Sequence, residues 1–330
     1  MRQHSLREMV ESAEYAVQVE QLEKKFGDFT AVSSIDFTIG RGEIVGLLGP
    51  NGSGKTTTLN MISGLSQPTS GRVRVFGVDP RKQATVARRL LGVVPQETAL
   101  YEELSAARNL MFHAELFGYR GKEKMRRVGN MLELAQLTDR ARSRVSSFSG
   151  GMKRRLAIVR AMLHDPWLVY LDEPTLGVDV QSRNVIWDYI LQLKKEGKSV
   201  LLTTNYLEEA NALCDRIAIL DHGRLLVNDK PSQLKSSFGS SVLELGVGSR
   251  PDAALITALK SLPGIQGITD HDGQLIISFS GDNGEQAGAM VPKILSVISG
   301  AGYTLSQINL REPSLDEVFL ALTGKGVRDA

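Results

Sequence analysis

Hydrophobic and polar residues alternate near the amino terminus of the chain. The alternation in Ile35, Phe37 and Ile39 has the period of a strand with one buried face. Gly27 and Gly40 fall where the chain would need turns. This part of the sequence therefore predicts antiparallel strands.

Farther along, short continuous apolar runs are separated by helical spacing. The runs cover residues 43–48, 168–171 and 199–203, and a helical pattern lies between the last two, over 181–195. Such alternation of buried strands and helices predicts a parallel sheet flanked by helices. Residues 86–144 combine helical spacing with many charges, and we predict an all-α insertion there.

The composition and the order of predicted elements indicate that the last third of the sequence is a separate domain. Around residues 230–241 the composition shifts to Lys, Pro, Ser and Gly, which indicates a boundary. Beyond it the order of predicted elements is βαββαβ, that of a ferredoxin-like fold. We predict an α/β protein with a large domain over 16–235, a small α+β domain over 240–324 and an N-terminal extension over 1–15. The extension has no apolar core typical of a secretory signal, and we expect a frayed helix.

Composition narrows the classes of function. The 39 Lys and Arg residues nearly balance the 37 Asp and Glu residues, and a net charge of +2 provides no basic field for nucleic acid. The single cysteine, Cys214, cannot form an intrachain disulfide, and the five histidines have no metal-ligand spacing. We expect a reducing, cytoplasmic setting and no structural metal. No apolar run approaches the roughly 18 to 20 residues that span a bilayer.

A glycine-rich segment lies between the apolar run at 43–48 and a predicted helix. Its residues are Gly49, Pro50, Asn51, Gly52, Ser53, Gly54, Lys55, Thr56 and Thr57. The segment matches the phosphate-binding loop consensus at every fixed position, in the strand-loop-helix context that the motif requires. Backbone N–H groups would surround the β-phosphate, Lys55 would neutralise phosphate oxygens, and the Thr56 hydroxyl would coordinate Mg²⁺. We therefore predict that this segment binds the phosphate groups of a ligand together with Mg²⁺.

Two carboxylates, Asp172 and Glu173, follow the apolar run at 168–171. Open α/β sheets bind their ligands at the carboxyl ends of their strands. Alone, such a pair would usually be a solvated turn. Together with a phosphate-binding loop, Asp172 is interpreted as a Mg²⁺ ligand and Glu173 as the general base for the attacking water.

Ser149, Gly150 and Gly151 stand at the start of a predicted helix, where backbone N–H groups favour an anion. Locally, this is only a well-capped helix. However, a phosphate loop, a Ser-Gly-Gly helix start and a strand ending in Asp-Glu-Pro-Thr occur here in the order that defines the ATP-binding cassette (ABC) ATPases. The chain resembles that family from about residue 16 to 324. The resemblance implies a P-loop NTPase cassette with a RecA-like parallel core, an antiparallel β subdomain and a helical insertion.

The resemblance also implies a site shared by two chains. The Ser-Gly-Gly start of one chain would close over ATP on the phosphate loop of the other, in a homodimer or equivalent cassette dimer. Gln96 would contact Mg²⁺ and the attacking water, and Asp179 would contact the partner cassette. Phe26 would stack on adenine, although an aromatic residue there could equally be core.

Asn205 departs from the family pattern, because a histidine that contacts the γ-phosphate is usual at this position. An amide donates a hydrogen bond but cannot be protonated, so we expect turnover that is slower or geometrically different. Since Glu173, Lys55, Thr56 and Gln96 are all present, we favour an active ATPase over a cassette that only binds ATP.

Two further features resemble the branch of the family that serves drug, polysaccharide and lipid exporters. Phe148 and Met152 replace the usual Leu and Gln around the Ser-Gly-Gly start, and residues 312–324 are similar to the ending of subunits in that branch. The resemblance implies a separate membrane-spanning permease and a peripheral place at the cytoplasmic face of the cell membrane.

The permease would contact the segment after the glutamine, by the same resemblance. This segment includes Leu100, Tyr101, Leu104 and Asn109, although its apolar residues could equally be core. We also hypothesise that the small domain stabilises the dimer or tunes its opening.

Two other functions fit the sequence less well. A soluble ABC ATPase acting on nucleic acid or ribosomes would have tandem cassettes, or a long coiled coil between the phosphate loop and Ser149, and neither is present. A small-molecule kinase on a phosphate-loop scaffold would leave the Ser-Gly-Gly helix start unexplained.

Overall fold

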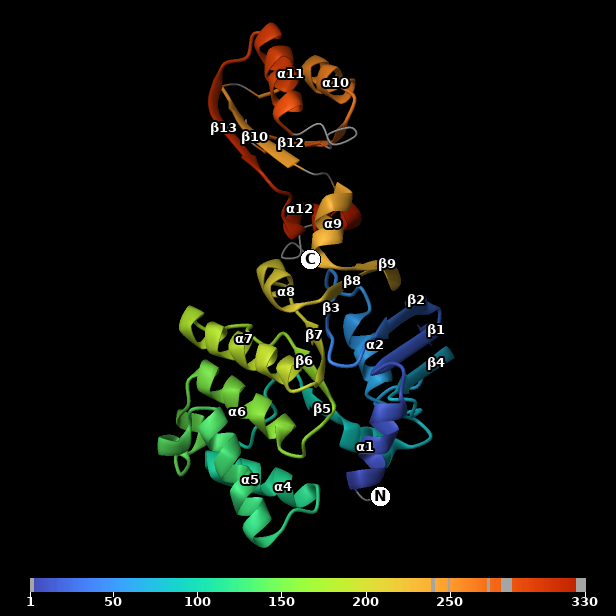
Figure 1. Cartoon of the computed structure of the whole chain (residues 1–330), viewed down its shortest axis with the longest axis vertical. Helices are drawn as coiled ribbons and strands as arrows, with labels where there is room; N and C mark the ends of the chain where they lie inside the picture. The colour runs from blue at the N-terminus through green and yellow to red at the C-terminus, as the bar shows by residue number, and fades with distance from the viewer. Residues whose placement is uncertain (1–2, 239–240, 249, 272–273, 280–286, 325–330) are drawn as a thin grey trace. The chain divides into compact units, whose positions relative to one another are not determined.

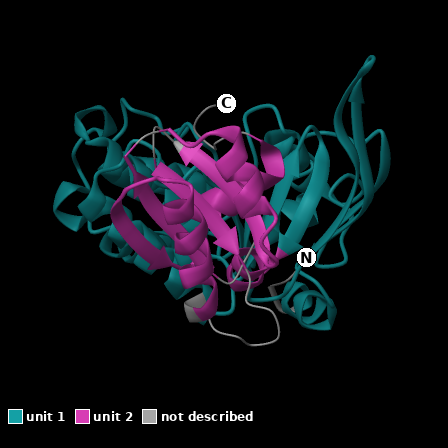
Figure 2. Cartoon of the chain, turned by 90° about the horizontal axis from the view of Figure 1, so that it is seen from above, with its two compact units in different colours: residues 1–228, 327–330 teal, residues 229–326 magenta. Residues whose placement is uncertain are grey.

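The computed structural model describes residues 3–238, 241–248, 250–271, 274–279 and 287–324 (Figure 1). They fall into two compact units, which divide between Asn228 and Asp229 (Figure 2). The sequence placed this boundary at 235–240. The structure places it earlier because helix α9 (Pro231–Phe238) packs against α12 (Leu315–Thr323) within the second unit.

The alternating pattern near the amino terminus forms a three-stranded sheet in the order β2-β1-β4. Its strands are β1 (Val17–Phe26), β2 (Phe29–Ile39) and β4 (Ser70–Val75). β1 pairs antiparallel with both neighbours, as predicted. Its inward residues belong to the main hydrophobic core of the first unit.

The apolar runs form a six-stranded sheet in the order β5-β6-β7-β3-β8-β9. The strands are β3 (Ile44–Leu48), β5 (Leu91–Val94), β6 (Leu168–Asp172), β7 (Ser199–Thr203), β8 (Arg216–Asp221) and β9 (Arg224–Asp229). The first five of these strands in the sheet pair in parallel. Every residue of β3 and β7 is buried, as expected for strands covered on both faces.

Helices connect and cover these strands. They are α1 (Gln3–Ser12), α2 (Lys55–Ile62), α3 (Ala84–Leu90), α4 (Ala106–Leu116), α5 (Gly121–Leu134), α6 (Gly150–Met162), α7 (Val180–Lys195) and α8 (Leu207–Leu213), with short 3₁₀ turns at Thr138–Arg140 and Val145–Ser147. The prediction of an all-α insertion over 86–144 was wrong at its start. β5 lies inside that range as a strand of the parallel sheet, and its four residues, Leu-Gly-Val-Val, are too few to distinguish from helix by periodicity.

The N-terminal extension is a packed helix and not a frayed one. Leu6 and Val10 of α1 are buried in the main core of the first unit. Arg41 donates hydrogen bonds to the carbonyls of Val10, at 3.3 Å, and Glu11, at 2.8 Å. These bonds satisfy carbonyls that a helix end leaves without intrahelical partners. Residues 1 and 2 of the extension lie outside the described part of the chain.

The second unit has the predicted βαββαβ order and a four-stranded sheet, β11-β12-β10-β13. Its elements are β10 (Ser241–Val247), α10 (Ala253–Lys260), β11 (Ile265–His271), β12 (Gln274–Phe279), α11 (Ala287–Gly300) and β13 (Leu305–Arg311). Neighbouring strands are antiparallel. Leu243 and Leu245 of β10 form one core with residues of α10 and α11.

Candidate active site

The predicted site residues gather at one edge of the parallel sheet. The phosphate loop follows β3, Gln96 follows β5, Glu173 follows β6 and Asn205 follows β7. Since β5, β6, β7 and β3 are neighbours and parallel, their carboxyl ends meet at the same edge. The fold thus brings together segments that lie far apart in the sequence.

The glycines of the phosphate loop are required by close backbone approaches. A Cβ atom on Gly49 would lie 2.2 Å from the carbonyl oxygen of Leu220. Gly54 has φ of 103°, and a Cβ atom there would lie 2.5 Å from the carbonyl oxygen of Ala31. Neither position tolerates a side chain, because atoms at these distances overlap and a positive φ disfavours any residue but glycine.

Lys55 begins helix α2 and lies across the loop. Its Nζ donates to the carbonyl oxygens of Gly49, at 2.6 Å, and Pro50, at 2.9 Å. Burial lowers the pKa of Lys55, and the nearby carboxylates of Glu173 and Asp172 act in the opposite direction. Thr56, the next residue, is exposed in the first turn of α2.

Asp172 is held by the neighbouring strand. The hydroxyl of Thr203, the last residue of β7, donates to Asp172 Oδ1 at 2.5 Å. Two residues after Thr203, the side-chain amide of Asn205 donates from Nδ2 to Glu173 Oε1 at 2.8 Å. The residue that replaces the family's histidine therefore contacts the proposed base directly.

Glu173 combines an unusual backbone with an unusual carboxyl group. Its φ is 46°, in the left-handed region that costs a non-glycine residue about 1–2 kcal/mol. Its N–H donates to the carbonyl oxygen of Thr203 at 3.0 Å, which holds this conformation. Burial raises the pKa of Glu173, and Asp172 raises it further, while Lys55 lowers it. A carboxylate with a raised pKa is a stronger base, as general-base catalysis requires.

Arg154 of α6 is a site residue that the sequence analysis missed. It is 4% exposed, and its guanidinium donates only to backbone carbonyls among its described hydrogen bonds. The acceptors are the carbonyl oxygens of Pro95 (2.7 Å), Gln96 (3.2 Å), Pro174 (2.9 Å) and Asp172. One cation thus connects the helix that starts at Ser149 with the loops after β5 and β6.

Glu209 of α8 was missed as well. It is fully buried, and its Oε1 accepts from the Thr175 hydroxyl at 2.8 Å and from Trp187 Nε1 at 2.9 Å. Its Oε2 has no hydrogen-bond partner among the described residues. Glu209 therefore ties the loop after Glu173 to helix α7.

The Ser-Gly-Gly start lies beside the predicted dimer contact. Ser149 caps α6 by accepting from the Met152 N–H at 3.3 Å, and Asp179 caps α7 by accepting from the Ser182 N–H at 2.9 Å. A Cβ atom on Gly151 would lie 2.7 Å from Ser182 Oγ, so glycine lets the two helix starts approach closely. Both cap residues are exposed.

Three predicted contacts have different outcomes. Phe26 is 55% exposed at the end of β1, which excludes the alternative that it is core. Gln96 is exposed, and its described contact is through its backbone. Asn109 is 1% exposed and its Nδ2 donates to the Tyr101 carbonyl oxygen at 2.9 Å. The prediction of Asn109 as a surface contact was therefore wrong, because it fixes the preceding loop from inside.

A cavity of about 640 Å³, lined in part by His164 and Trp167, lies away from this site. Trp167 immediately precedes β6, whereas Asp172 ends it. The cavity is thus at the amino end of the strand, opposite the edge that carries the phosphate loop, and we assign it no part in the chemistry.

This edge of the sheet combines three chemical groups: a loop suited to bind an anion, the cation Lys55 and the candidate base Glu173. The loop and Lys55 suit phosphate groups, and the partly buried carboxylate of Glu173 suits activation of water. These features define a P-loop ATPase.

Comparisons with known proteins specify the family. Residues 32–176 match the ABC transporter family, and residues 230–323 match the family described as ATP-binding protein DrrA1-3-like, C-terminal domain. The chain is similar to the linearmycin resistance ATP-binding protein LnrL of Bacillus subtilis (strain 168), with 40% identity over 95% of this chain and 100% of that protein. The daunorubicin resistance ATP-binding protein DrrA3 of Streptomyces coeruleorubidus is 36% identical over 94% of this chain and 97% of its own length. The chain belongs to the ATP-binding proteins of ABC transporters.

Solved structures agree with this assignment. A structure described as the ATP binding subunit of an ABC transporter superposes with a TM-score of 0.63 and 31% identity, over 68% of this chain and 93% of that one. A dimeric post-hydrolysis state of the ATP-binding cassette MJ0796, bound to ADP and Pi, gives a TM-score of 0.59 and 30% identity over 65% and 98%. The predicted fold class and the predicted ATPase activity are confirmed. In the described part of the chain, no helix is long and apolar enough to cross a bilayer.

Proposed function

We propose that two copies of the chain close head to tail on two molecules of ATP and thereby drive export through a separate membrane-spanning partner. The observation that carries this proposal is the exposed Ser149 helix start beside Asp179 in the first unit. The N–H groups in the first turn of a helix suit an anion. The phosphate loop lies between β3 and α2, whereas this helix start precedes α6, and we infer that the helix start meets ATP on the phosphate loop of a second copy.

Within each site, the chain's own residues divide the chemistry. Phe26 stacks on adenine, and the residues from Gly49 to Thr57 surround the phosphates. Glu173 accepts a proton from the attacking water while Asn205 donates to its carboxylate and orients it. Gln96 positions the water, and Ser149, Gly150 and Gly151 of the second copy donate to the γ-phosphate.

The residues present suit Mg²⁺ as the cofactor. Mg²⁺ prefers oxygen ligands and is typically held by one or two carboxylates together with substrate phosphates. The Thr56 hydroxyl is exposed and the Asp172 carboxylate is oriented by Thr203, so these two residues, with Gln96, would hold the ion. When bound, Mg²⁺ supplies positive charge against the phosphate oxygens.

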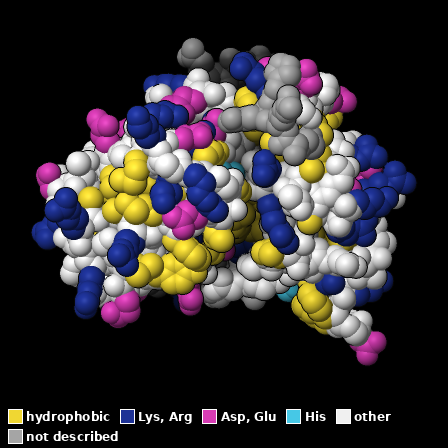
Figure 3. All heavy atoms as spheres, turned by 90° about the horizontal axis from the view of Figure 1, so that it is seen from below, with side chains coloured by type: hydrophobic (Ala, Val, Ile, Leu, Met, Phe, Trp, Pro, Cys, Tyr) yellow, Lys and Arg dark blue, Asp and Glu magenta, His cyan; other side chains and the backbone are white. Residues whose placement is uncertain are grey.

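An exposed apolar patch on α4 and its preceding loop supports a permease contact at the cytoplasmic face of the membrane. The rings of Tyr101 and Phe112 pack edge to face, with centroids 5.3 Å apart, yet both are exposed, as is Leu116. Figure 3 shows hydrophobic side chains gathered on this side of the chain among Lys and Arg. Such patches on a soluble surface favour a protein partner. In cells the chain should sediment with membranes, and deletion of its permease should release it.

The test of ATP-driven closure uses Glu173→Gln. Loss of the base leaves ATP bound but unhydrolysed, so this variant should elute as a dimer from a sizing column with MgATP. It should not do so with ADP, or with ATP and EDTA. Ser149→Arg added to Glu173→Gln should abolish the dimer, because a bulky cation blocks the helix start. A double variant that still dimerises would overturn the proposed role of Ser149.

A further inference from the structure

The sheet of the second unit has an open edge at β13. Residues 306–310 are exposed consecutively, and Ile308 and Leu310 are 51% and 47% exposed. An edge strand presents unpaired N–H and C=O groups along its outer side. β13 thus combines free backbone groups with exposed apolar side chains.

The exposed side chains continue the apolar face of the sheet. Ile308 lies opposite Leu245, and Leu310 lies opposite Leu243. Residues directly opposite in adjacent strands share a face, and Leu243 and Leu245 belong to the core under α10 and α11. The apolar stripe therefore runs from the covered core to the uncovered edge.

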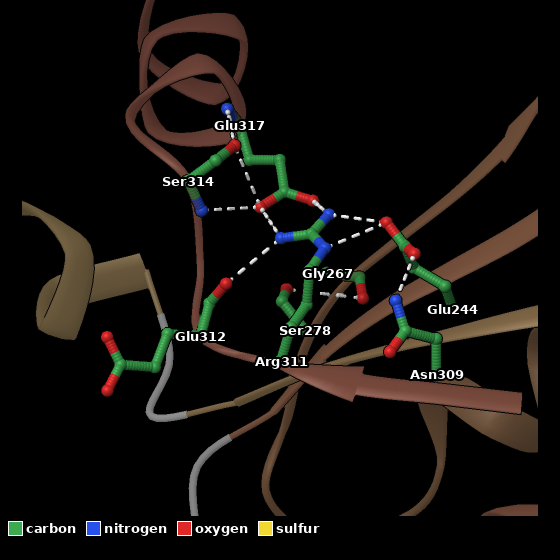
Figure 4. Close-up of polar contacts among 8 residues, drawn as sticks. All are labelled: Glu244, Gly267, Ser278, Asn309, Arg311, Glu312, Ser314 and Glu317. Atoms are coloured by element: carbon green, nitrogen blue, oxygen red, sulfur yellow. Dashed lines mark hydrogen bonds and ion pairs between the residues drawn. The ribbon is translucent and has the colours of Figure 1, made fainter. Parts of the chain in front are cut away.

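The other face of β13 is held in place by charged contacts (Figure 4). Arg311 donates from Nη1 to Glu317 Oε2 at 2.9 Å and from Nε to Glu244 Oε1 at 2.8 Å. Asn309 Nδ2 donates to Glu244 Oε2 at 3.0 Å. These contacts attach the strand to β10 and α12, so the edge is ordered before any partner arrives, which reduces the entropy lost on binding.

The opposite edge of the same sheet is protected. β11 contains Gly267 and carries Asp270, which pairs with Arg250 at 3.4 Å. Natural sheets often use charged residues to prevent edge-to-edge pairing. Residues 305–310 of β13 contain no charged residue, glycine or proline. Only one edge is thus free to pair.

We propose that β13 pairs antiparallel with β13 of a second copy of this chain, centred on Ile308, so that the two small domains share one continuous sheet. A two-fold axis pairs a strand with itself only in the antiparallel sense. In this register Ile308 faces itself, and Gln307 lies beside Asn309 of the second copy. Because the segment is neutral, no like charges face each other.

The extent of β13 pairing rests on the proposed function, because cassette closure brings the two small domains together. The choice of β13 as the pairing strand does not depend on that function. Two cassettes that close on ATP keep the two small domains at a high effective concentration, and a weak second contact then becomes populated. Backbone pairing at a sheet edge is a general mode of recognition. The contact would keep two chains together while their cassettes open.

Thiol cross-linking of the full chain tests this proposal. The native chain has one cysteine, Cys214, which is 8% exposed and whose thiol pKa is raised by burial, so it reacts slowly. Ile308→Cys places a thiol at the two-fold axis. Thr269→Cys, on exposed β11, is the matched control. With a short bis-maleimide, Ile308→Cys should give about tenfold or more cross-linked dimer than Thr269→Cys, without nucleotide and more strongly with MgATP.

Equal yields from the two positions, or none from Ile308→Cys, would overturn the pairing. A second variant, Ile308→Lys, places two like charges opposite each other at a position that is 51% exposed. It should weaken self-association of the chain in sedimentation without nucleotide, and an unchanged association would also overturn the pairing. ATP turnover is read in the same samples. If the chain hydrolyses ATP but Ile308→Cys does not cross-link, only the β13 pairing is refuted. If Ile308→Cys cross-links but the chain does not hydrolyse ATP, only the proposed function is refuted.

Discussion

The two units differ in how their buried and partly buried charged groups are paired. Around β6 and β7 in the first unit, Glu173 has a raised pKa and a left-handed backbone, and Arg154 is buried without a carboxylate hydrogen-bond partner among its described contacts. Around Arg311 in the second unit, each charge is paired. Hydrogen bonds from Arg311 lower the pKa of Glu244, and Ser314 and Glu317 form a capping box at α12.

The unpartnered polar atoms follow the same division. Within the described residues, the buried side-chain nitrogen and oxygen atoms that lack a hydrogen-bond partner all lie in the first unit, among them Ser53 Oγ and Glu209 Oε2. Perturbed and incompletely paired groups cluster at functional sites, whereas fully paired networks hold a fold together. We therefore assign the chemistry to the groups around β6 and β7, and a structural role in the second unit to the contacts around Arg311.

The largest expected effect is on the base. Glu173→Gln should lower the rate of phosphate release by about 10²–10⁴, because the amide cannot accept the proton. Phosphate release at saturating MgATP measures this, and a nucleotide-binding assay should show that affinity for ATP is retained. A rate loss below about tenfold would show that Glu173 is not the base.

The next effect concerns the buried cation. Arg154→Met leaves carbonyls of the loops after β5 and β6 unsatisfied, and we expect about 3 kcal/mol less free energy of unfolding, with lower ATPase activity. Arg155→Met on the same helix is the control, since the described contact of Arg155 is one hydrogen bond, to Gln136 Oε1. It should cost about 1 kcal/mol or less. Denaturant unfolding measures both, and equal losses would contradict the role given to Arg154.

A smaller effect is expected in the second unit. Arg311→Met should lower the free energy of unfolding of this unit by about 1–2 kcal/mol, while ATPase activity stays within about twofold. Because the folded pKa of Glu244 lies below its ordinary value of 4.5, its contribution is present above that pH and is lost as pH falls through the folded pKa. The variant should lose this acid dependence in unfolding curves. A large loss of ATPase activity would break the division between the units.

The smallest effect should come from Asn205→His. In the wild type, activity falls as pH drops through the raised pKa of Glu173, because the carboxylate is the reactive form, and Asn205 does not titrate. A histidine introduces a second titration near its usual pKa of about 6.5. The pH profile of phosphate release should therefore gain a step near neutrality. An unchanged profile would mean that position 205 does not act on the base.

Those candidate site residues could be predicted from the sequence whose chemistry follows from residue type and motif spacing. The phosphate loop and the Asp172–Glu173 pair could be found because their motifs combine fixed residue types with a strand context. Arg154 and Glu209 could not be found this way. Each sits in a run of charged residues, Lys153 to Arg155 and Glu208 to Glu209, and only packing determines which member is buried.

The fold was predictable to a similar extent. Alternation and apolar runs located most strands, because burial on one or both faces leaves a period in the sequence. β5 was taken for part of a helical insertion because a strand of four residues carries no clear period. The packing of α1 was missed because its two buried residues, Leu6 and Val10, are too few to predict a core contact.

The central claim is that one ATPase site is built from two chains, and mixing two inactive variants tests it most directly. Lys55→Met removes the phosphate-loop cation, and Ser149→Arg blocks the helix start, so each alone should lose about 10²-fold or more in phosphate release. An equimolar mixture should recover about a quarter of the wild-type rate, because half of randomly paired dimers are mixed and each holds one intact site. A mixture no more active than its separate components would contradict the account.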